Sequence, residues 1–141
     1  MNPSLIDRVE ILHGRRSEDA RGWLHVPLAA SQLPPNTPFG EVYVIHCTAA
    51  DRRRGDHLHR NMDEWFSVVQ GSADLLLADP DTGARRSIRL HAGDARTVRV
   101  PAGLAHCLVS RDGPMTALAW ATREHDPADV VPFRAVMEDP V

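Results

Sequence analysis

Two short segments constrain the fold of this chain more than any other part of its sequence. The first contains His57, His59 and, after a turn, Glu64. Successive side chains of an extended strand point to opposite faces, so His57 and His59 share one face. A returning strand that begins at Glu64 would bring its carboxylate opposite the two imidazoles. Two imidazoles and a carboxylate that converge on one point are a donor set that first-row divalent metals prefer.

The second segment lies about forty residues downstream and reads as a turn that leads into a strand. Pro101 and Gly103 are typical turn residues, and His106 follows near the start of an apolar run. Such a turn can bring a third imidazole to the point on which the first segment converges.

Short β-patterned runs separated by turn residues occupy most of the chain, which predicts an all-β sandwich or barrel. Turn chemistry predicts hairpin loops at 79–83 and 111–114, and only the tail, 127–138, is expected to hold a helical turn or two. The predicted strands are 23–26, 42–47, 57–60, 64–70, 73–78, 85–90, 97–100, 105–109 and 115–121.

The two segments resemble the motifs of the cupin superfamily, H-x-H followed by E and G, and P-x-G-x-x-H. Two other motif positions differ, because Asp51 stands where cupins have Gly and Ser110 where they have Asn, but neither position supplies a metal ligand in cupins. The resemblance implies a single-domain cupin (double-stranded β-helix, jelly-roll barrel) over residues 1–141, with a core at about 20–122 and a short C-terminal tail. The matching residues are His57, His59, Glu64, Gly71, Pro101, Gly103 and His106.

Three further segments resemble nucleotide-sugar epimerases and ketoisomerases. Residues 19–24 are similar to the D-x-R-G strand of the dTDP-4-dehydrorhamnose 3,5-epimerase family. Residues 42–45 with 54–59 are similar to the V-Y-x-I and R-G-x-H-x-H pattern of 3,4-ketoisomerases, and 120–127 to the cupin domain of capsular nucleotide-sugar reductase/epimerases. The resemblance implies an isomerase or epimerase that removes a proton next to the ketone of a 4-keto-6-deoxy nucleotide-sugar, in deoxysugar, polysaccharide or natural-product biosynthesis.

That reaction needs a base and a group that stabilises the enolate oxygen, and two arrangements fit. In the first, a divalent metal, zinc or else iron, nickel or manganese, polarises the keto oxygen, and Tyr43 or His46 is the base. Glu64 favours this arrangement, because ketoisomerases of this type usually carry Gln there. The metal ligands would be His57, His59, Glu64 and His106.

In the second arrangement the histidines themselves are the acids and bases. His57 takes the proton, His59 or His106 assists, and Tyr43, the only tyrosine, returns a proton to the opposite face of the sugar. His46 lies on the opposite strand face from Tyr43, so at most one of the two faces the cavity.

The sixteen basic residues are all arginine. Without a lysine amine, no side chain can form a Schiff base, and arginine is the only cationic side chain left to hold a phosphate or carboxylate. The resemblance points to Arg21 and Arg54 for this task. Arg21 matches a position that often reaches into a neighbouring subunit, which implies a homodimer.

The formal charge of −3 and the lack of a basic block argue against nucleic acid as a partner. No apolar stretch approaches the roughly 18 residues of a membrane span, and the first residues lack the layout of a signal peptide, so we expect no membrane partner and a cytoplasmic protein. Cys47 and Cys107 lie in apolar runs and are expected to be reduced core residues.

Two other functions are compatible with the same motifs. A cupin with three histidines and one glutamate could hold iron and act as a dioxygenase, because the ligand set does not name the reaction. A non-catalytic cupin could instead bind a sugar or effector without turning it over.

Overall fold

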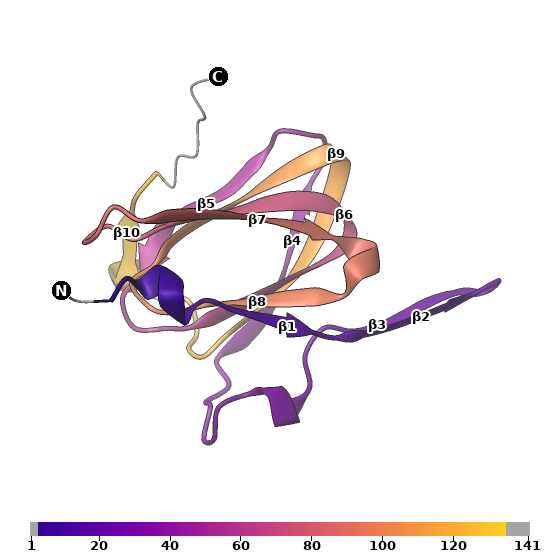
Figure 1. Ribbon diagram of the computed structural model, residues 1–141, viewed down its shortest axis with the longest axis horizontal. Helices are drawn as coiled ribbons and strands as arrows, with labels where there is room; N and C mark the ends of the chain where they lie inside the picture. Colours follow the sequence, from indigo (N-terminus) through magenta and orange to yellow (C-terminus); the bar gives the residue numbers. More distant parts are fainter. Residues whose placement is uncertain (1–2, 135–141) are drawn as a thin grey trace.

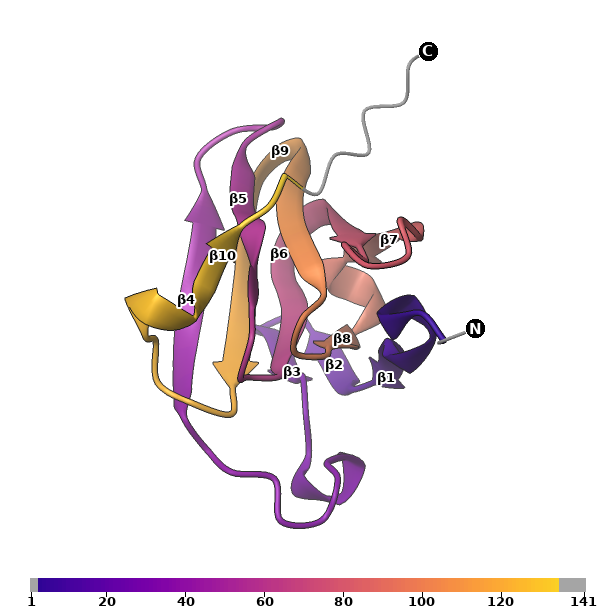
Figure 2. The ribbon, with the colours of Figure 1, turned by 90° about the vertical axis from the view of Figure 1, so that its left-hand side faces the viewer.

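The structure, a computed structural model, describes residues 3–134 and consists almost entirely of antiparallel strands. Its main sheet has the order β1-β8-β6-β9-β5-β10, with β4 paired to β9 and β7 paired to β6. Figure 2 shows this sheet curling from β4 and β5 through β9 and β6 to β8 and β1. The predicted all-β jelly-roll fold is confirmed. The strands of the main sheet are β1 (Glu10–His13), β4 (Glu41–Cys47), β5 (Arg53–His59), β6 (Glu64–Ala78), β7 (Arg85–His91), β8 (Arg96–Val100), β9 (Ala105–Ala121) and β10 (Val130–Pro132).

The two longest strands, β6 and β9, pair along their whole lengths and form the centre of the sheet (Figure 1). Alternation along β6 separates two apolar clusters: Leu75 and Leu77 are fully buried in the larger one, and Leu76 lies in the smaller one on the other face. A strand that is buried on both faces carries a near-continuous apolar run, which is what residues 75–78 show.

Two of the predicted breaks between strands are wrong, because in each case the strand continues through the predicted break. Runs 64–70 and 73–78 form the single strand β6, and runs 105–109 and 115–121 form the single strand β9. Segment 111–114 is therefore not a hairpin loop. Asp112 and Gly113 do adopt positive φ, but they make a bulge, since Ser72 pairs with Arg111 while Gln70 pairs with Thr116. A bulge uses the same residue types as a turn without reversing the chain.

The other hairpin loop, 79–83, is confirmed. Gly83 donates its N–H to the carbonyl of Asp79 at 2.9 Å, and Asp79 donates its own to Ala84 at 2.9 Å. Short 3-10 turns lie outside the strands, at η1 (Leu5–Arg8), η2 (Ala30–Gln32), η3 (Ala92–Asp94) and η4 (Pro127–Asp129).

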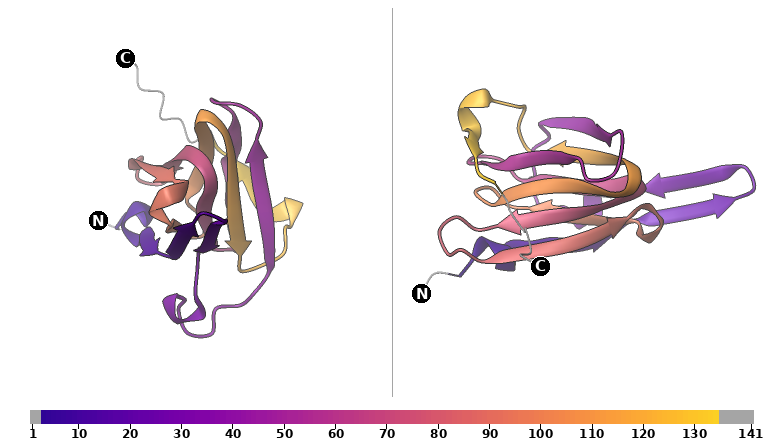
Figure 3. Two further views of the ribbon diagram at one scale, coloured as in Figure 1. Left: turned by 90° about the vertical axis from the view of Figure 1, so that its right-hand side faces the viewer. Right: turned by 90° about the horizontal axis from the view of Figure 1, so that it is seen from above.

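The N-terminal strands were not all predicted. Only 23–26 was expected, and it is part of β3 (Gly22–Val26), which pairs with β2 (Arg15–Asp19) in a separate two-stranded sheet. Figure 1 and the right-hand view of Figure 3 show this hairpin projecting from the body of the molecule. Strand β1 pairs with β8 instead.

The tail folds back onto the sheet. One short turn, η4, lies within the predicted helical region, but it is followed by β10, which pairs with β5 through Val130 and His59. The rest of that predicted region, 135–138, lies outside the described residues. Both β1 and β10 fall outside the expected core of 20–122, while the limits of a single domain over 1–141 remain a prediction.

Cys47 and Cys107 are both buried and free, as expected for reduced core residues. Within residues 3–134, the structure contains no helix of the length and apolar character that crossing a membrane requires.

Candidate active site

Three histidines and a glutamate meet where β5 ends and β6 and β9 begin. His57 and His59 lie at the C-terminal end of β5. His57 pairs with His106 of the neighbouring strand β9. Ligating atoms of the three histidines lie within 4.8 Å of one another. His106 and Glu64 are 4% and 2% exposed, so both face the interior. The structure therefore brings together the four residues that the two motifs singled out.

Glu64 is the centre of this cluster. The hydroxyl of Tyr43 on β4 donates to one of its oxygens, Oε2. The other oxygen, Oε1, lies 3.2 Å from Nε2 of His106 and 3.4 Å from Nε2 of His59. Side chains from three other strands thus surround the carboxylate of Glu64.

The surroundings of Glu64 keep it ionised and Tyr43 protonated. Burial opposes the charge on Glu64, but hydrogen bonds from His106 and Tyr43 outweigh it and lower the pKa of Glu64 to about 2. Burial, together with the adjacent carboxylate, raises the pKa of Tyr43 far above its ordinary value. The phenol is consequently a hydrogen-bond donor at neutral pH.

The imidazoles of His57 and His59 are neutral at pH 7. Burial, followed by the neighbouring rings of His106 and His59, lowers the pKa of His57 to about 4. Burial also lowers the pKa of His59, although Glu64 opposes the shift. A neutral imidazole with a protonated phenol nearby is a base paired with an acid.

Two adjoining cavities give access to the cluster, and both are lined by Tyr43 and His57. One has a volume of about 340 Å³ and also includes Arg54, Phe66 and His106 in its lining. The other has a volume of about 300 Å³; it is lined by Glu41, Tyr43, His57, His59, Met62, Glu64 and His125. Volumes of this size suit a small ligand.

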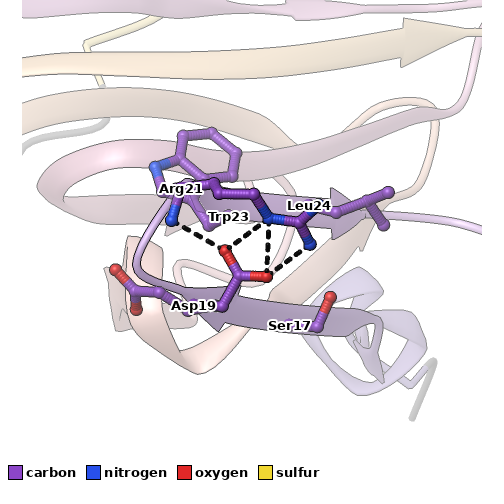
Figure 4. A pocket seen from close by; sticks show the side chains of 7 residues that line it. Ser17, Asp19, Arg21, Trp23 and Leu24 are labelled. Carbon is purple, nitrogen blue, oxygen red and sulfur yellow. Dashed lines mark hydrogen bonds and ion pairs between the residues drawn. The ribbon is translucent and has the colours of Figure 1, made fainter.

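The sequence-predicted arginines lie in different places. Arg54 lines the same cavity as His57 and His106. Arg21 is at the tip of the β2–β3 hairpin, with a side chain 91% exposed and an ion pair to Asp19 at 2.6 Å. Figure 4 shows this pair beside Ser17, Trp23 and Leu24, a shallow hollow that belongs to the hairpin alone. Within one chain, Arg21 does not contribute to the histidine cluster.

His46, one of the two candidate bases in the metal arrangement, does not face Glu64. Its Nδ1 lies 2.9 Å from the hydroxyl of Thr116 in an exposed position. Alternation along β4 leaves Tyr43 half-buried and His46 exposed. Both residues nevertheless belong to the lining of the 340 Å³ cavity, so the expectation that at most one of them faces it is not met.

Sequence reasoning did not find Asp129. Its carboxylate is 5% exposed, and Oδ2 lies 3.6 Å from Nδ1 of His59. His125, an exposed residue of the same segment, places its ring 6.3 Å from the ring of His59. The Asp126-Pro127 pair indicates the start of the short turn η4. It gives no indication that this turn contacts β5.

The comparisons with known proteins bear on both the family and the fold. The family profile described as polysaccharide biosynthesis C-terminal domain matches residues 18–131. The chain belongs to this family. A search of curated proteins found no significant match.

Solved structures with the same fold include an epimerase, a ketoisomerase and a capsular polysaccharide assembling protein. One is dTDP-4-dehydrorhamnose 3,5-epimerase from Bacillus anthracis with TDP and PPi bound, with 19% identity, coverage of 99% of this chain and 85% of that chain, and a TM-score of 0.79. A 3,4-ketoisomerase from Helicobacter canadensis has 20% identity, coverage of 88% and 90%, and a TM-score of 0.73. The capsular polysaccharide assembling protein CapF from Staphylococcus aureus has 21% identity, coverage of 69% and 27%, and a TM-score of 0.64. These similarities confirm the cupin fold.

The predicted divalent metal cofactor is wrong. The dTDP-4-dehydrorhamnose 3,5-epimerases among the similar structures act without a metal. The geometry supplies a physical reason, because one oxygen of Glu64 is already engaged by Tyr43 and the other by His106. Among the described residues, the only group with metal-ligand spacing contains the three histidines without this carboxylate. The predicted set is therefore a cluster around a buried carboxylate, in which Glu64 lies close to His106 and His59, and the ring of His57 contacts the rings of both.

The neutral state of His57 predicts a pH-dependent stability. Its pKa is lower in the folded chain, about 4, than the ordinary 6.5, so the unfolded chain binds more protons between these values. Stability is therefore fully present above pH 6.5 and falls as the pH drops to 4. We expect a contribution of about 1–2 kcal/mol, allowing for solvent screening of this half-buried ring. Urea unfolding at pH 7 and pH 4.5 measures it.

The variant His57→Asn should lose less stability than the wild type between the two pH values. His13→Asn, which alters an exposed histidine on β1, is the matched control and should behave as the wild type does. An identical pH dependence in the wild type and in His57→Asn would contradict the assignment of a buried neutral His57.

Proposed function

We propose that this protein is an epimerase or ketoisomerase that removes a proton next to the ketone of a 4-keto-6-deoxy nucleotide-sugar. The observation that carries the proposal is the pairing, within one pair of adjoining cavities, of neutral imidazoles with the protonated phenol of Tyr43. The enzymes named among the similar structures, epimerases and a ketoisomerase, support it. So does membership of a polysaccharide biosynthesis family.

The chemistry follows from these residues. The C–H bond beside the ketone breaks, the proton moves to a ring nitrogen of His57 or His59, and the electron pair moves to the keto oxygen. Donors in the cavity stabilise the resulting enolate. Tyr43 then gives its proton to the enolate carbon. Because the pKa of Tyr43 is raised, the phenol gives up its proton only to a strong base such as the enolate carbon.

Arg54 is the proposed binding residue for the diphosphate. It lines the cavity that His57 and His106 also line, and its guanidinium can hold a phosphate with two parallel hydrogen bonds. The nucleotide would then lie at the Arg54 end and the sugar at the histidine end of the cavity.

A homodimer is part of the proposal. An isolated two-stranded hairpin is marginally stable in water, yet β2 and β3 pair only with each other, and Trp23 and Leu24 on the hairpin are 48% and 62% exposed. A second copy that covers the hairpin would bury this apolar surface and carry Arg21 toward the partner's cavity. Free Cys47 and Cys107 fit the proposed cytoplasmic location.

Solvent exchange tests the proposed reaction directly. In deuterium oxide, the protein should place deuterium on the carbon next to the ketone of dTDP-4-keto-6-deoxyglucose, which mass spectrometry and proton NMR detect. Tyr43→Phe should slow turnover to product by about 10²–10⁴-fold, because the reprotonating acid is lost. Binding of the sugar without exchange would instead identify a non-catalytic binding protein and contradict the proposal.

The role of Arg54 predicts a loss of nucleotide affinity. Arg54→Gln should weaken dTDP binding about 10–100-fold, the effect of losing a charged hydrogen-bonding group, as measured by titration calorimetry. Arg52→Gln, which removes the same charge two residues away on an exposed position, is the control and should bind dTDP almost as the wild type does. Equal losses in the two variants would rule out a specific contact by Arg54.

The proposed dimer predicts the mass of the protein in solution. Sedimentation equilibrium should give twice the chain mass of 15.6 kDa. The double variant Trp23→Ser with Leu24→Ser removes the exposed apolar side chains of β3 and should shift the protein toward the monomer. A wild type that sediments as a monomer at all concentrations would contradict the dimer.

A further inference from the structure

Asp129 is a buried carboxylate beside the histidine cluster whose position in the fold is tightly held. It ends η4, directly before β10, and the first residue of β10, Val130, pairs with His59. The backbone N–H of Arg60 also contacts the carbonyl of Asp129 at 3.2 Å. The tail and the end of β5 are therefore fixed to each other at the point where His59 enters the site.

The two oxygens of the Asp129 carboxylate have different surroundings. Oδ1 accepts the backbone N–H of Arg60 at 3.0 Å and the side-chain amide of Asn61 at 2.9 Å. Within the described residues, Oδ2 is buried and has no hydrogen-bond partner, and the same is true of Nδ1 of His59. These two atoms lie 3.6 Å apart. A buried polar atom without a partner destabilises the fold, so Oδ2 of Asp129 and Nδ1 of His59 are the most favourable partners for each other.

The opposite ring nitrogen of His59 faces a second carboxylate. Its Nε2 lies 3.4 Å from Oε1 of Glu64. The side chain of His59 also lines the 300 Å³ cavity. If the neutral ring carries its proton on Nδ1, then Nε2 presents a lone pair to an anionic oxygen. A proton added to Nε2 turns this repulsion into attraction, and the resulting imidazolium lies between two carboxylates.

His57 has a different environment. Its ring packs edge-on against the rings of His59 and His106 at 4.8 and 5.0 Å. These neighbours and burial oppose a positive charge there, and Glu64 only partly offsets them. The groups that face His59 are Glu64, Asp129, His106 and His125, of which the two carboxylates favour the charged ring. Of the two histidines proposed as bases, His59 is the one placed to receive a proton.

We propose that Asp129 is a positioning residue that holds the proton of neutral His59 on Nδ1, so that Nε2 is the atom that accepts the substrate proton. The second half of this statement rests on the proposed function. In that step the C–H bond beside the ketone breaks, an N–H bond forms at Nε2, and the electron pair moves to the keto oxygen, giving an enolate and an imidazolium.

Nitrogen NMR of the protein without substrate tests the tautomer. Long-range proton–nitrogen correlation spectra of ¹⁵N-labelled protein at pH 7.5 should show His59 protonated on Nδ1 and unprotonated on Nε2. This arm requires no variant and no sugar, so it decides the role of Asp129 even if the proposed reaction fails. A wild-type ring that carries a proton on Nε2 overturns the proposal.

The variant Asp129→Asn should reverse the tautomer. The oxygen of the new amide must still accept from Arg60 and Asn61, which turns its NH₂ group toward Nδ1 of His59. A donor in that place forces the ring proton onto Nε2. An unchanged tautomer in folded Asp129→Asn overturns the proposal. The control is Asp126→Asn, which alters an exposed aspartate that caps Ala128 on the same turn and should leave His59 unchanged.

Kinetics of deuterium exchange test the second half. Asp129→Asn should lower kcat about 10²-fold with little change in KM, because Nε2 no longer has a free lone pair. Asp126→Asn should keep the wild-type rate. A wild-type kcat in Asp129→Asn, with its tautomer reversed, would overturn the assignment of His59 as the proton acceptor.

Discussion

The buried carboxylate of Glu64 is the interaction on which the rest of the site depends. An ionised carboxylate with 2% exposure is tolerated only when hydrogen bonds and charge partners replace water. Here the donors are Tyr43 of β4 and His106 of β9, while Glu64 begins β6. Three strands must therefore close correctly for the charge to be satisfied, and removing one donor would leave a costly unpaired group.

Burial sets the protonation of the groups around this carboxylate. Burial, together with Glu64, keeps the phenol of Tyr43 protonated, and burial keeps the rings of His57 and His59 neutral although Glu64 opposes this. An acid and a base that coexist at pH 7 are what proton transfer beside a ketone requires. Asp129 extends this arrangement, because it faces the side of His59 that Glu64 does not reach. Folding and chemistry thus rely on one network of buried polar groups.

The local patterns predicted a large part of the fold and the cluster, for identifiable reasons. Strand alternation places His57 and His59 on one face and Tyr43 on the inner face of β4, because the side-chain period of a strand is fixed. The metal was wrongly predicted because the same residue types and spacing serve either a metal or a hydrogen-bonded network. Asp129 was missed because the three-residue strand β10, which brings it to His59, is too short to show a periodic pattern. The bulge at Asp112 and Gly113 could not be distinguished from a turn without knowing that β6 continues opposite it.

Measuring solvent exchange at the sugar carbon in metal-depleted protein tests the central claim, that a buried carboxylate rather than a metal organises the acid and the base. Wild-type protein dialysed against a strong chelator, with its metal content determined by elemental analysis, should exchange at an undiminished rate. Folded Glu64→Gln should exchange at least about 10²-fold more slowly under the same conditions. Exchange that disappears with the chelator and returns when zinc is added back would contradict the account.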